Sequence, residues 1–524
     1  MPTRSDAAVE RADALGRPLV LLAATLALRL PALVRPYFFS SDEAVYSALA
    51  VRMLHGVDPY VGAVDHKPVG VDLLYAAVYA VTGPNHMFAI HILLVLIVWS
   101  TALVLARAAV LVSGNRAACL AGLFYVCASA AGMPRDVQPA NTELLLNLPT
   151  AVALWLVCRA VVRPVPAAET EPRDHLGLLA AAGVLTAVAG LFKYQASLVG
   201  VAWAVAVVQA SGASSRTLRQ LTALAAGFLA IAAGLCGYFY FRGEWDAFTF
   251  WGWRYNFSYI AALSAREKEW NLVRRTGTMM LFWLPLVTLA IVAARRRALP
   301  LVVIAWLACE CIAVSVGGRF FLYYYLIALP PLAVAAAIGA AAATMFRPGR
   351  RFAGSAGRAV AVLAAVSIVA SATLAWTWQT IQPDFRREHD VESAVGDYVR
   401  THSAPDDRLF VWGNASQIYY FANRVMGTRF AFCNYHTGKI WGSWAYAVDA
   451  GDTSMFIVPR AWAELLDDLD RTPPAFIVDT GAGRLASFDR HPIGRYKELA
   501  ERVARDYRLD AVVAGVPIYR RQAR

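Results

Sequence analysis

The sequence predicts an all-α membrane protein that crosses the bilayer many times and carries a small α/β domain at its C-terminal end. Hydrophobic residues make up 58% of the 524 residues and charged residues only 16%, a balance typical of multi-span membrane proteins. Apolar runs long enough to cross about 30 Å of hydrocarbon recur along most of the chain. From residue 381 onward they give way to short apolar runs bounded by polar, Gly and Pro residues. We therefore expect a transmembrane domain over 1–380 and a second domain over 381–524.

Eleven apolar runs qualify as transmembrane helices. The first follows a polar N-terminal segment but no small-residue cleavage site, so we expect it to be retained as a span. The fifth and sixth runs are joined by a tight hairpin at Lys193. The predicted spans are 18–36, 86–112, 117–133, 144–162, 176–192, 195–210, 221–241, 277–294, 299–316, 321–345 and 359–379.

The distribution of arginines predicts the orientation. The formal net charge is +12, and the basic residues cluster in short connections between apolar runs. The positive-inside rule explains this pattern better than a nucleic-acid partner does. With a cytoplasmic N-terminus, nearly every basic cluster falls inside, and an odd number of spans exports the C-terminal domain. The outer connections then include 134–143, 242–276 and a first loop, 37–85, with juxtamembrane helices.

The cysteines indicate neither a disulfide framework nor a metal site. The chain has seven cysteines, and all except Cys433 lie in apolar runs. Their spacing matches no pattern of metal ligands. We expect them to be small core residues.

The segment 381–524 predicts strands and helices in alternation. The runs 408–413 and 475–479 are typical of buried strands, and 511–519 of a closing strand or hairpin. Residues 462–469 and 493–504 have helical patterns. The segment has no Gly-rich phosphate loop and no nucleophile elbow, so we expect a lid or docking domain without chemistry of its own.

The first outer loop opens with the sequence Ser-Ser-Asp-Glu at 40–43. Ser40 and Glu43 have the spacing of a capping box, which predicts a helix start at this point. The apolar positions that follow favour an amphipathic helix lying along the membrane surface. Asp42 has two interpretations: it stabilises the positive end of the helix dipole, or it serves as a general base at the water edge of a cavity.

The same loop carries three motifs in order. They are Asp-Glu-Ala-x-Tyr at 42–46, Met-Leu-x-Gly-x-x-Pro-Tyr at 53–60 and Lys-Pro at 67–68. This arrangement after a first span resembles the membrane-embedded glycosyltransferases of the GT-C superfamily. It is most similar to the bacterial branch that includes the lipid A aminoarabinose and galacturonic acid transferases, and more distantly to the protein O-mannosyltransferases. The architecture matches over about the first 345 residues, and the sharp motifs lie in about the first 70.

The resemblance implies a polyprenyl-phosphate sugar donor, a bacterial plasma membrane, a reaction on its outer face and inversion at the sugar. It implies that Asp42 is the catalytic base and that Lys67 holds the donor phosphate. The chain departs from the family pattern at two positions. His66 stands where the aminoarabinose enzymes tend to have Glu, and Tyr323 stands where the family often has His.

Other outer residues fit the chemistry of a departing lipid phosphate, whose charge needs cations. Lys193 and Arg319 are candidates for this role. A single lysine at the end of a span often snorkels to the interface, but the Phe-Lys-Tyr-Gln setting of Lys193 favours function. Arg319 could equally be an interfacial anchor with an aromatic belt. Further residues expected to reach the same cavity are Glu43, Tyr60, Asp65, His66, Asn141, Glu143, Tyr194, Tyr323 and Tyr325.

With three cations available for the phosphate, we expect that no metal or other cofactor is required. A metal site made of carboxylates remains the alternative, because four acidic residues could converge on the outer side. These are Asp42, Asp58, Asp65 and Glu143.

The sequence thus predicts an integral-membrane glycosyltransferase that moves a sugar from a polyprenyl-phosphate donor to an envelope acceptor, which is a lipid, a glycan or a protein. Two alternatives come from other classes. A transporter or flippase of lipid-linked sugar would show internal repeats and charges near mid-span, and neither is evident. A non-catalytic envelope scaffold would need far fewer than eleven spans.

Overall fold

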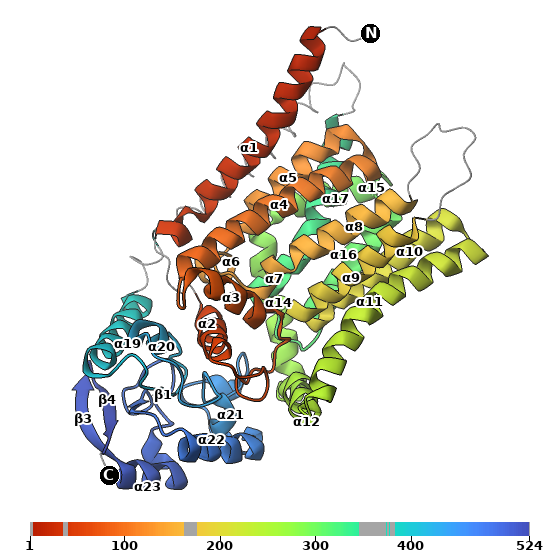
Figure 1. Cartoon of the computed structure of the whole chain (residues 1–524). Helices are drawn as coiled ribbons and strands as arrows, with labels where there is room; N and C mark the ends of the chain where they lie inside the picture. Colours follow the sequence, from red (N-terminus) through yellow and green to blue (C-terminus); the bar gives the residue numbers. More distant parts are fainter. Residues whose placement is uncertain are drawn as a thin grey trace.

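The computed structural model describes residues 4–34, 40–161, 175–344, 374, 377 and 383–522. The chain is mostly helical, as predicted, with one small sheet near its C-terminal end (Figure 1). The span predicted at 359–379 lies outside the described residues except for Leu374 and Thr377. The domain boundary expected near residue 380 also lies outside them.

Most predicted spans correspond to apolar helices. Within the described ranges, five segments are long and apolar enough to cross a membrane: Met87–Ser113, Thr142–Val161, Tyr194–Ser211, Ser215–Phe241 and Leu322–Ala343. Shorter apolar helices occupy Pro18–Val34, Gly70–Thr82, Leu120–Ser129, Leu176–Phe192 and Leu301–Ser315. Length and composition alone therefore identify five or six spans, and the total of eleven stays a prediction.

The helices of this bundle have the following bounds: α1 Arg4–Val34, α2 Ser41–Leu54, α3 Gly70–Thr82, α4 Met87–Ser113, α5 Asn115–Ser129, α6 Pro134–Val137, α7 Thr142–Leu145, α8 Asn147–Val161, α9 Leu176–Phe192, η1 Tyr194–Leu198, α10 Val199–Ser211, α11 Ser215–Phe241, α12 Trp245–Thr249, η2 Phe250–Arg254, α13 Tyr255–Ala261, α14 Ala265–Phe282, α15 Leu284–Arg295, α16 Leu301–Ser315, η3 Leu322–Ala328 and α17 Leu329–Thr344. Among them α7–α8, η1–α10 and η3–α17 form continuous apolar segments.

The run predicted as the span 277–294 is not one straight helix, because α14 and α15 meet at Trp283 with a bend of 89°. The two helices together are apolar and long enough for one broken span. Pro285 lies in the first turn of α15 and has no N–H to continue the hydrogen bonding of α14.

The predicted outer connection 242–276 is also largely helical, and α14 begins with a complete capping box between Ser264 and Glu267.

Small residues allow the closest helix contacts. A Cβ atom added to Gly183 of α9 would lie 2.0 Å from the carbonyl oxygen of Leu224, and one added to Gly227 of α11 would lie 1.9 Å from that of Ala180. Both distances are far inside van der Waals contact, so α9 and α11 approach backbone to backbone only because these positions are glycine. This contact fixes the end of α9, from which Lys193 follows.

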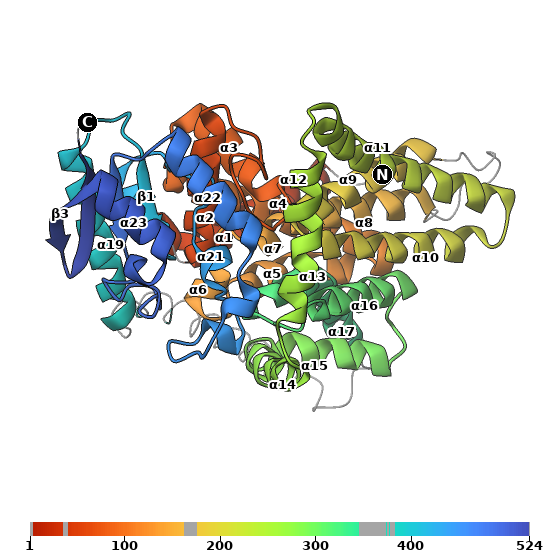
Figure 2. The same ribbon diagram turned by 90° about the horizontal axis from the view of Figure 1, so that it is seen from below.

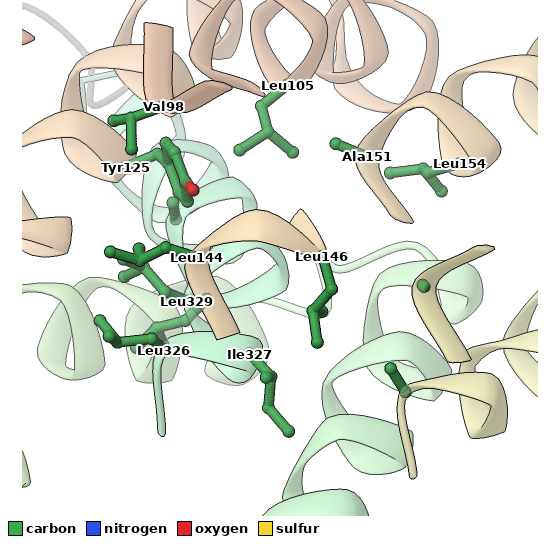
Figure 3. Close-up of a cluster of buried hydrophobic side chains, with 14 of the residues drawn as sticks. Val98, Leu105, Tyr125, Leu144, Leu146, Ala151, Leu154, Leu326, Ile327 and Leu329 are labelled. Atoms are coloured by element: carbon green, nitrogen blue, oxygen red, sulfur yellow. The ribbon is translucent and has the colours of Figure 1, made fainter. Parts of the chain in front are cut away.

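The apolar core of the bundle includes side chains of the short elements α7 and η3, which lie near the outer end of the bundle. Figure 3 shows Val98 and Leu105 of α4 together with Leu144, Leu146, Leu326 and Ile327. All of these side chains are essentially inaccessible to solvent. The short elements α7 and η3 are therefore fixed by apolar packing, and the polar residues next to these side chains in sequence have fixed positions.

The first outer loop differs from its prediction. Helix α2 is buried from Glu43 to Arg52 and lies between the bundle and the C-terminal part (Figure 1), so it is not an amphipathic surface helix. The expected capping box is also wrong, because Ser40 makes no side-chain cap bond. Glu43 turns inward instead: its Oε1 accepts from the backbone N–H of Ala140 at 2.8 Å and lies 3.1 Å from His91 Nε2.

The C-terminal part contains a four-stranded sheet with the order β1-β2-β4-β3. Strands β1 (Leu409–Trp412) and β2 (Phe476–Asp479) pair in parallel, and β4 (Val516–Arg521) pairs antiparallel with β2 and with β3 (Tyr507–Val513). The predicted strands and closing hairpin are thus confirmed. The helices are α19 Pro383–His402, α20 Gln417–Ala422, α21 Asn434–Thr437, η4 Trp444–Tyr446, η5 Ser454–Phe456, α22 Pro459–Arg471, η6 Ile493–Arg495 and α23 Lys497–Asp506.

The C-terminal part packs on one end of the bundle (Figure 2). The backbone N–H of Val64 donates to Arg429 O at 2.9 Å, and Arg52 donates to Met426 O at 2.5 Å. Apolar residues of the first outer loop and of α11–α13 belong to the same buried cluster as the sheet residues. The two parts therefore share a core, and the first outer loop lies under the C-terminal part.

Candidate active site

A cavity of about 1140 Å³ lies where the first outer loop, the outer ends of the bundle helices and the C-terminal part meet. Its lining includes residues of α2, α7, the hairpin after α9, α14 and η3, and also of α19 and the loop before η4. These segments are far apart in sequence, and the fold brings their polar side chains to one place.

Asp42 and Lys67 form the central pair of this cavity. Lys67 Nζ donates to Asp42 Oδ1 at 2.9 Å and to Tyr46 OH at 3.0 Å. Tyr323 OH donates to the other carboxylate oxygen of Asp42 at 3.3 Å. The Asp42 and Lys67 side chains are 26% and 25% exposed. The carboxylate is thus fixed by two donors and still faces the cavity.

Lys67 is held in its charged form. Burial opposes its charge, but Asp42 and Tyr46 outweigh this effect and raise the pKa of Lys67 well above its usual value. Tyr60 supports the loop from behind, because its OH donates to the backbone oxygen of Lys67 at 2.9 Å. Tyr60 itself has a left-handed backbone with φ of 63°. The position of the ammonium group is therefore set by both its side-chain and its backbone contacts.

Lys193 and Glu143 form a second pair in the same cavity. Lys193 Nζ lies 2.6 Å from Glu143 Oε1, and the side chains are 11% and 2% exposed. Thr142 Oγ1 donates to Glu143 Oε2 at 2.9 Å, and the ammonium group lies 3.2 Å from the centre of the Tyr324 ring. A snorkelling lysine would reach outward to water. Lys193 instead points inward, so the interpretation as an interfacial anchor is wrong.

Arg319 is buried, with 1% of its surface exposed, and its nitrogens bind backbone carbonyls rather than carboxylates. Nε donates to Trp441 O at 3.0 Å and Nη2 to Tyr259 O at 2.5 Å. Its guanidinium also lies over the Tyr259 ring, 3.4 Å from the centre. Arg319 thus joins the bundle to the C-terminal part and leaves its positive charge unneutralised by an acid among the described residues.

Asp65 and His66 precede Lys67 and occupy the wall of the cavity. Asp65 Oδ1 accepts from the backbone N–H of His66 at 2.7 Å, and His66 Nδ1 lies 3.0 Å from Tyr435 OH. Burial alone would raise the pKa of Asp65, but the positive charge of Lys67 and the bonds from His66 lower it below the usual value. Asp65 therefore adds negative charge beside Lys67.

Nine predicted site residues line the cavity together: Asp42, Asp65, His66, Lys67, Glu143, Lys193, Tyr194, Arg319 and Tyr323. Four others do not line it: Glu43, Tyr60, Asn141 and Tyr325. The Glu43 carboxylate is hydrogen-bonded to the backbone N–H of Ala140 and to His91 instead. The OH of Tyr325 is bonded to Thr276 Oγ1 at 2.5 Å, Tyr60 supports Lys67 from behind, and Asn141 is buried at the start of α7.

Sequence reasoning missed two arginines of α14. Arg274 and Arg275 line the cavity, and Arg275 Nη1 donates to the backbone oxygen of Arg319 at 2.8 Å. They were missed because their segment was predicted to be a loop and the start of a span. The Ser264–Glu267 capping box was the signal that could have placed them on a helix.

The described residues contain no group of three or more His, Cys, Asp or Glu side chains that could hold a metal. The alternative carboxylate cluster does not form there, since Asp58 is bound to Arg242 and to Tyr238 OH instead. The cysteine thiols whose positions are described are free.

No protein-family model and no curated protein matches the sequence. Solved structures do match. ArnT from Cupriavidus metallidurans in the apo state gives a TM-score of 0.61 at 14% identity, over 97% of this chain and 98% of that one. ArnT bound to undecaprenyl phosphate gives 0.58 at 13% identity, over 96% of each chain. The archaeal oligosaccharyltransferase AglB from Archaeoglobus fulgidus, in complex with an inhibitory peptide and a dolichol-phosphate, gives 0.51 at 12% identity, over 90% and 70%.

The chain has the GT-C fold. The expected resemblance is therefore confirmed at the level of the fold. It also extends further than the motifs indicated, because the match to ArnT includes the C-terminal part as well as the bundle.

Proposed function

We propose that the protein is an integral-membrane glycosyltransferase that moves a sugar from a polyprenyl-phosphate donor to a cell-envelope acceptor. The observation that carries this proposal is the Asp42–Lys67 pair, a carboxylate and a cation 2.9 Å apart in one cavity at the end of an apolar bundle. The GT-C fold supports it, since one ArnT structure with this fold was solved with undecaprenyl phosphate bound.

In the proposed reaction, Asp42 takes the proton of an acceptor hydroxyl or amine. The acceptor atom then bonds to the anomeric carbon while the bond from that carbon to the phosphate oxygen breaks. The products are the glycosylated acceptor and polyprenyl phosphate, and the attack from the opposite face inverts the sugar. Asp42 suits this task because Lys67 and Tyr323 fix its orientation and a quarter of its surface faces the cavity.

Cations stabilise the charge that develops on the leaving phosphate. Lys67 has three donor hydrogens, and Asp42 and Tyr46 account for two of them, which leaves the third for a phosphate oxygen. Lys193 is neutralised by Glu143, whereas Arg319 and the newly found Arg275 contact carbonyls and rings. We assign Lys67, Lys193, Arg319 and Arg275 to the donor phosphate region.

The proposed topology has a cytoplasmic N-terminus, eleven spans, a transmembrane domain over 1–380 and an extracytoplasmic domain over 381–524 in a bacterial plasma membrane. The arrangement supports it, because the cavity, the first outer loop and the C-terminal part all lie at the same end of the bundle (Figure 1).

Purified protein in lipid nanodiscs, supplied with undecaprenyl-phosphate sugars and an envelope extract as acceptor, tests the proposal. We expect release of undecaprenyl phosphate together with labelling of the acceptor, and loss of both in Asp42→Asn but not in the exposed control Asp449→Asn. A flippase would move the donor across a bilayer without cleaving it, and a scaffold would do neither. Unchanged release by Asp42→Asn would reject Asp42 as the base.

A further inference from the structure

The C-terminal part supplies one whole wall of the cavity. Its lining residues include Glu388, Glu392, Asn414, Gln417, Trp441 and Tyr446. No sequence motif placed any of them in a site, and the proposed chemistry of Asp42 and Lys67 uses none of them. They combine two aromatic rings with two amides and two carboxyl groups, and polar groups of this kind fix the orientation of a bound ligand.

Trp441 and Tyr446 form a stacked pair on this wall. Their ring centres lie 4.4 Å apart with an interplanar angle of 27°, and both side chains are half-buried, so ring surface remains open to the cavity. The backbone at Trp441 is fixed, because its carbonyl accepts from Arg319 and Gly442 follows with φ of 75°. A rigid aromatic surface of this kind favours a ligand that has an apolar face.

Glu392 of α19 lies on the same wall. Its residue surface is 4% exposed, and it lines the cavity without a hydrogen bond or ion pair to any of the described residues. Because Glu392 lines the cavity, its carboxyl group is available to a ligand that can form hydrogen bonds with it. Glu388 lines the cavity one turn earlier on the same helix.

The protonation state of Glu392 indicates which class of ligand can bind to it. Burial, with a contribution from the nearby Glu388, raises the pKa of Glu392 well above its usual value. A protonated carboxyl both donates and accepts hydrogen bonds, which suits neutral hydroxyl groups. A phosphate offers only acceptor atoms and would leave the acceptor oxygen of this carboxyl unused, and an apolar chain would leave Glu392 without a partner. A cation is disfavoured because Lys439 Nζ already lies 4.8 Å from the Tyr446 ring centre.

We propose that the C-terminal wall is a saccharide subsite, in which a sugar ring of the acceptor packs on Trp441 and Tyr446 and bonds to Glu392. This identity for the acceptor rests on the proposed function. The subsite adjoins the reaction centre through η3: the Phe321 and Tyr323 rings stack with centres 5.5 Å apart, and Tyr323 bonds to Asp42. Gly442 packs against Phe321, since a Cβ there would meet its ring at 2.8 Å. An acceptor glycan held on this wall thus has a path to Asp42.

Saturation-transfer difference NMR on the full-length protein in nanodiscs, free of sugar detergents, tests the subsite. The probes are the methyl glycosides of glucose, galactose, mannose, arabinose and N-acetylglucosamine. Dihexanoyl phosphatidic acid represents a phosphate or lipid ligand, and trilysine represents a cationic ligand. We expect at least one glycoside to bind and its signal to fall at least fivefold in Trp441→Ala and in Glu392→Leu, which has no hydrogen-bonding group. The matched controls are Trp444→Ala, 42% exposed and outside the lining, and the exposed Glu498→Leu.

Equal glycoside signals in the two variants and the controls would overturn the subsite, as would binding of only the phosphatidic acid or trilysine, or of no glycoside at all. Glu392→Leu keeps a similar side-chain volume without hydrogen-bonding groups, so it remains informative should Trp441→Ala fail to fold. The release of undecaprenyl phosphate by the wild type is measured separately. If the wild type binds a glycoside through Trp441 but never releases undecaprenyl phosphate, the saccharide subsite is supported and the proposed glycosyltransferase activity is rejected.

Discussion

Lys67 Nζ lies 2.9 Å from Asp42 Oδ1, so the proposed base and a proposed phosphate ligand are hydrogen-bonded to each other. The pair serves two purposes. It keeps a carboxylate and an ammonium group stable in a partly buried place, where either alone would be costly. In the proposed reaction it also places the donor phosphate next to the base, because a phosphate that approaches Lys67 lies within reach of the atom proposed to deprotonate the acceptor.

Replacement of Asp42 by Asn should abolish most transfer while sparing the fold. Asn conserves size and can still accept from Lys67, but it cannot take the acceptor proton. We expect kcat to fall by about 10²- to 10⁴-fold, the usual contribution of a general base, with little change in the apparent Km for the donor. Steady-state release of polyprenyl phosphate measures the rate, and thermal unfolding checks the fold against Asp449→Asn. A loss confined to Km would assign Asp42 to donor binding instead.

The Lys193–Glu143 pair should couple strongly in a double-mutant cycle. Lys193→Met or Glu143→Gln alone leaves one charged or polar partner in a buried place, which typically costs about 3–5 kcal/mol. The double variant removes both and should recover much of that loss. Unfolding in detergent with increasing denaturant gives the coupling energy. Lys497 and Glu501, an exposed pair on α23, form the matched control, and equal coupling in the two cycles would contradict a buried, paired Lys193.

The sequence predicted those parts of the fold that follow from composition and local pattern. The apolar runs placed α9 at 176–192, as observed, and the strand patterns placed β1 and β2 within a residue or two. These signals are local: hydrophobic length for a span and a bounded apolar run for a strand. The fold therefore agrees with expectation. Asp42, Lys67, Lys193 and Arg319 line one cavity, and their roles there stay predictions.

The failures have a tertiary origin. The spacing of Ser40 and Glu43 satisfied the capping-box pattern, but His91 and the Ala140 amide, from distant segments, compete for the Glu43 carboxylate. Helix α2 was expected at the membrane surface because no local signal shows that the C-terminal part covers it. The wall formed by Trp441 and Glu392 lacked a motif for the same reason, since it becomes a site only when it meets η3 and α14.

Arg319 should control how firmly the C-terminal part closes the cavity. Arg319→Lys conserves the charge, but a lysine ammonium group cannot donate to the Trp441 and Tyr259 carbonyls together as the planar guanidinium does. We expect faster amide hydrogen exchange over 439–446, measured by mass spectrometry, with the sheet unaffected. Arg266→Lys, on the exposed first turn of α14, is the control. Unchanged exchange in Arg319→Lys would show that the shared apolar core alone holds the two parts together.

Glu392 should make stability depend on pH in a defined direction. Its pKa in the folded protein is raised by burial and by Glu388, whereas the unfolded chain has an ordinary value of about 4.3. The folded state therefore binds the proton more tightly. The stability that the protonated group contributes is fully present below the unfolded pKa and is lost as pH rises toward the folded one. Glu392→Gln should accordingly raise the Tm above that of the wild type at neutral pH.

The difference in Tm should shrink as pH is lowered and vanish near pH 4, where wild-type Glu392 is protonated in both states. Thermal unfolding followed between pH 4 and pH 8 measures the two curves. Glu498→Gln, on the exposed surface of α23, should follow the wild type throughout. A Tm difference that is independent of pH would mean that Glu392 acts through its packing and not through its charge.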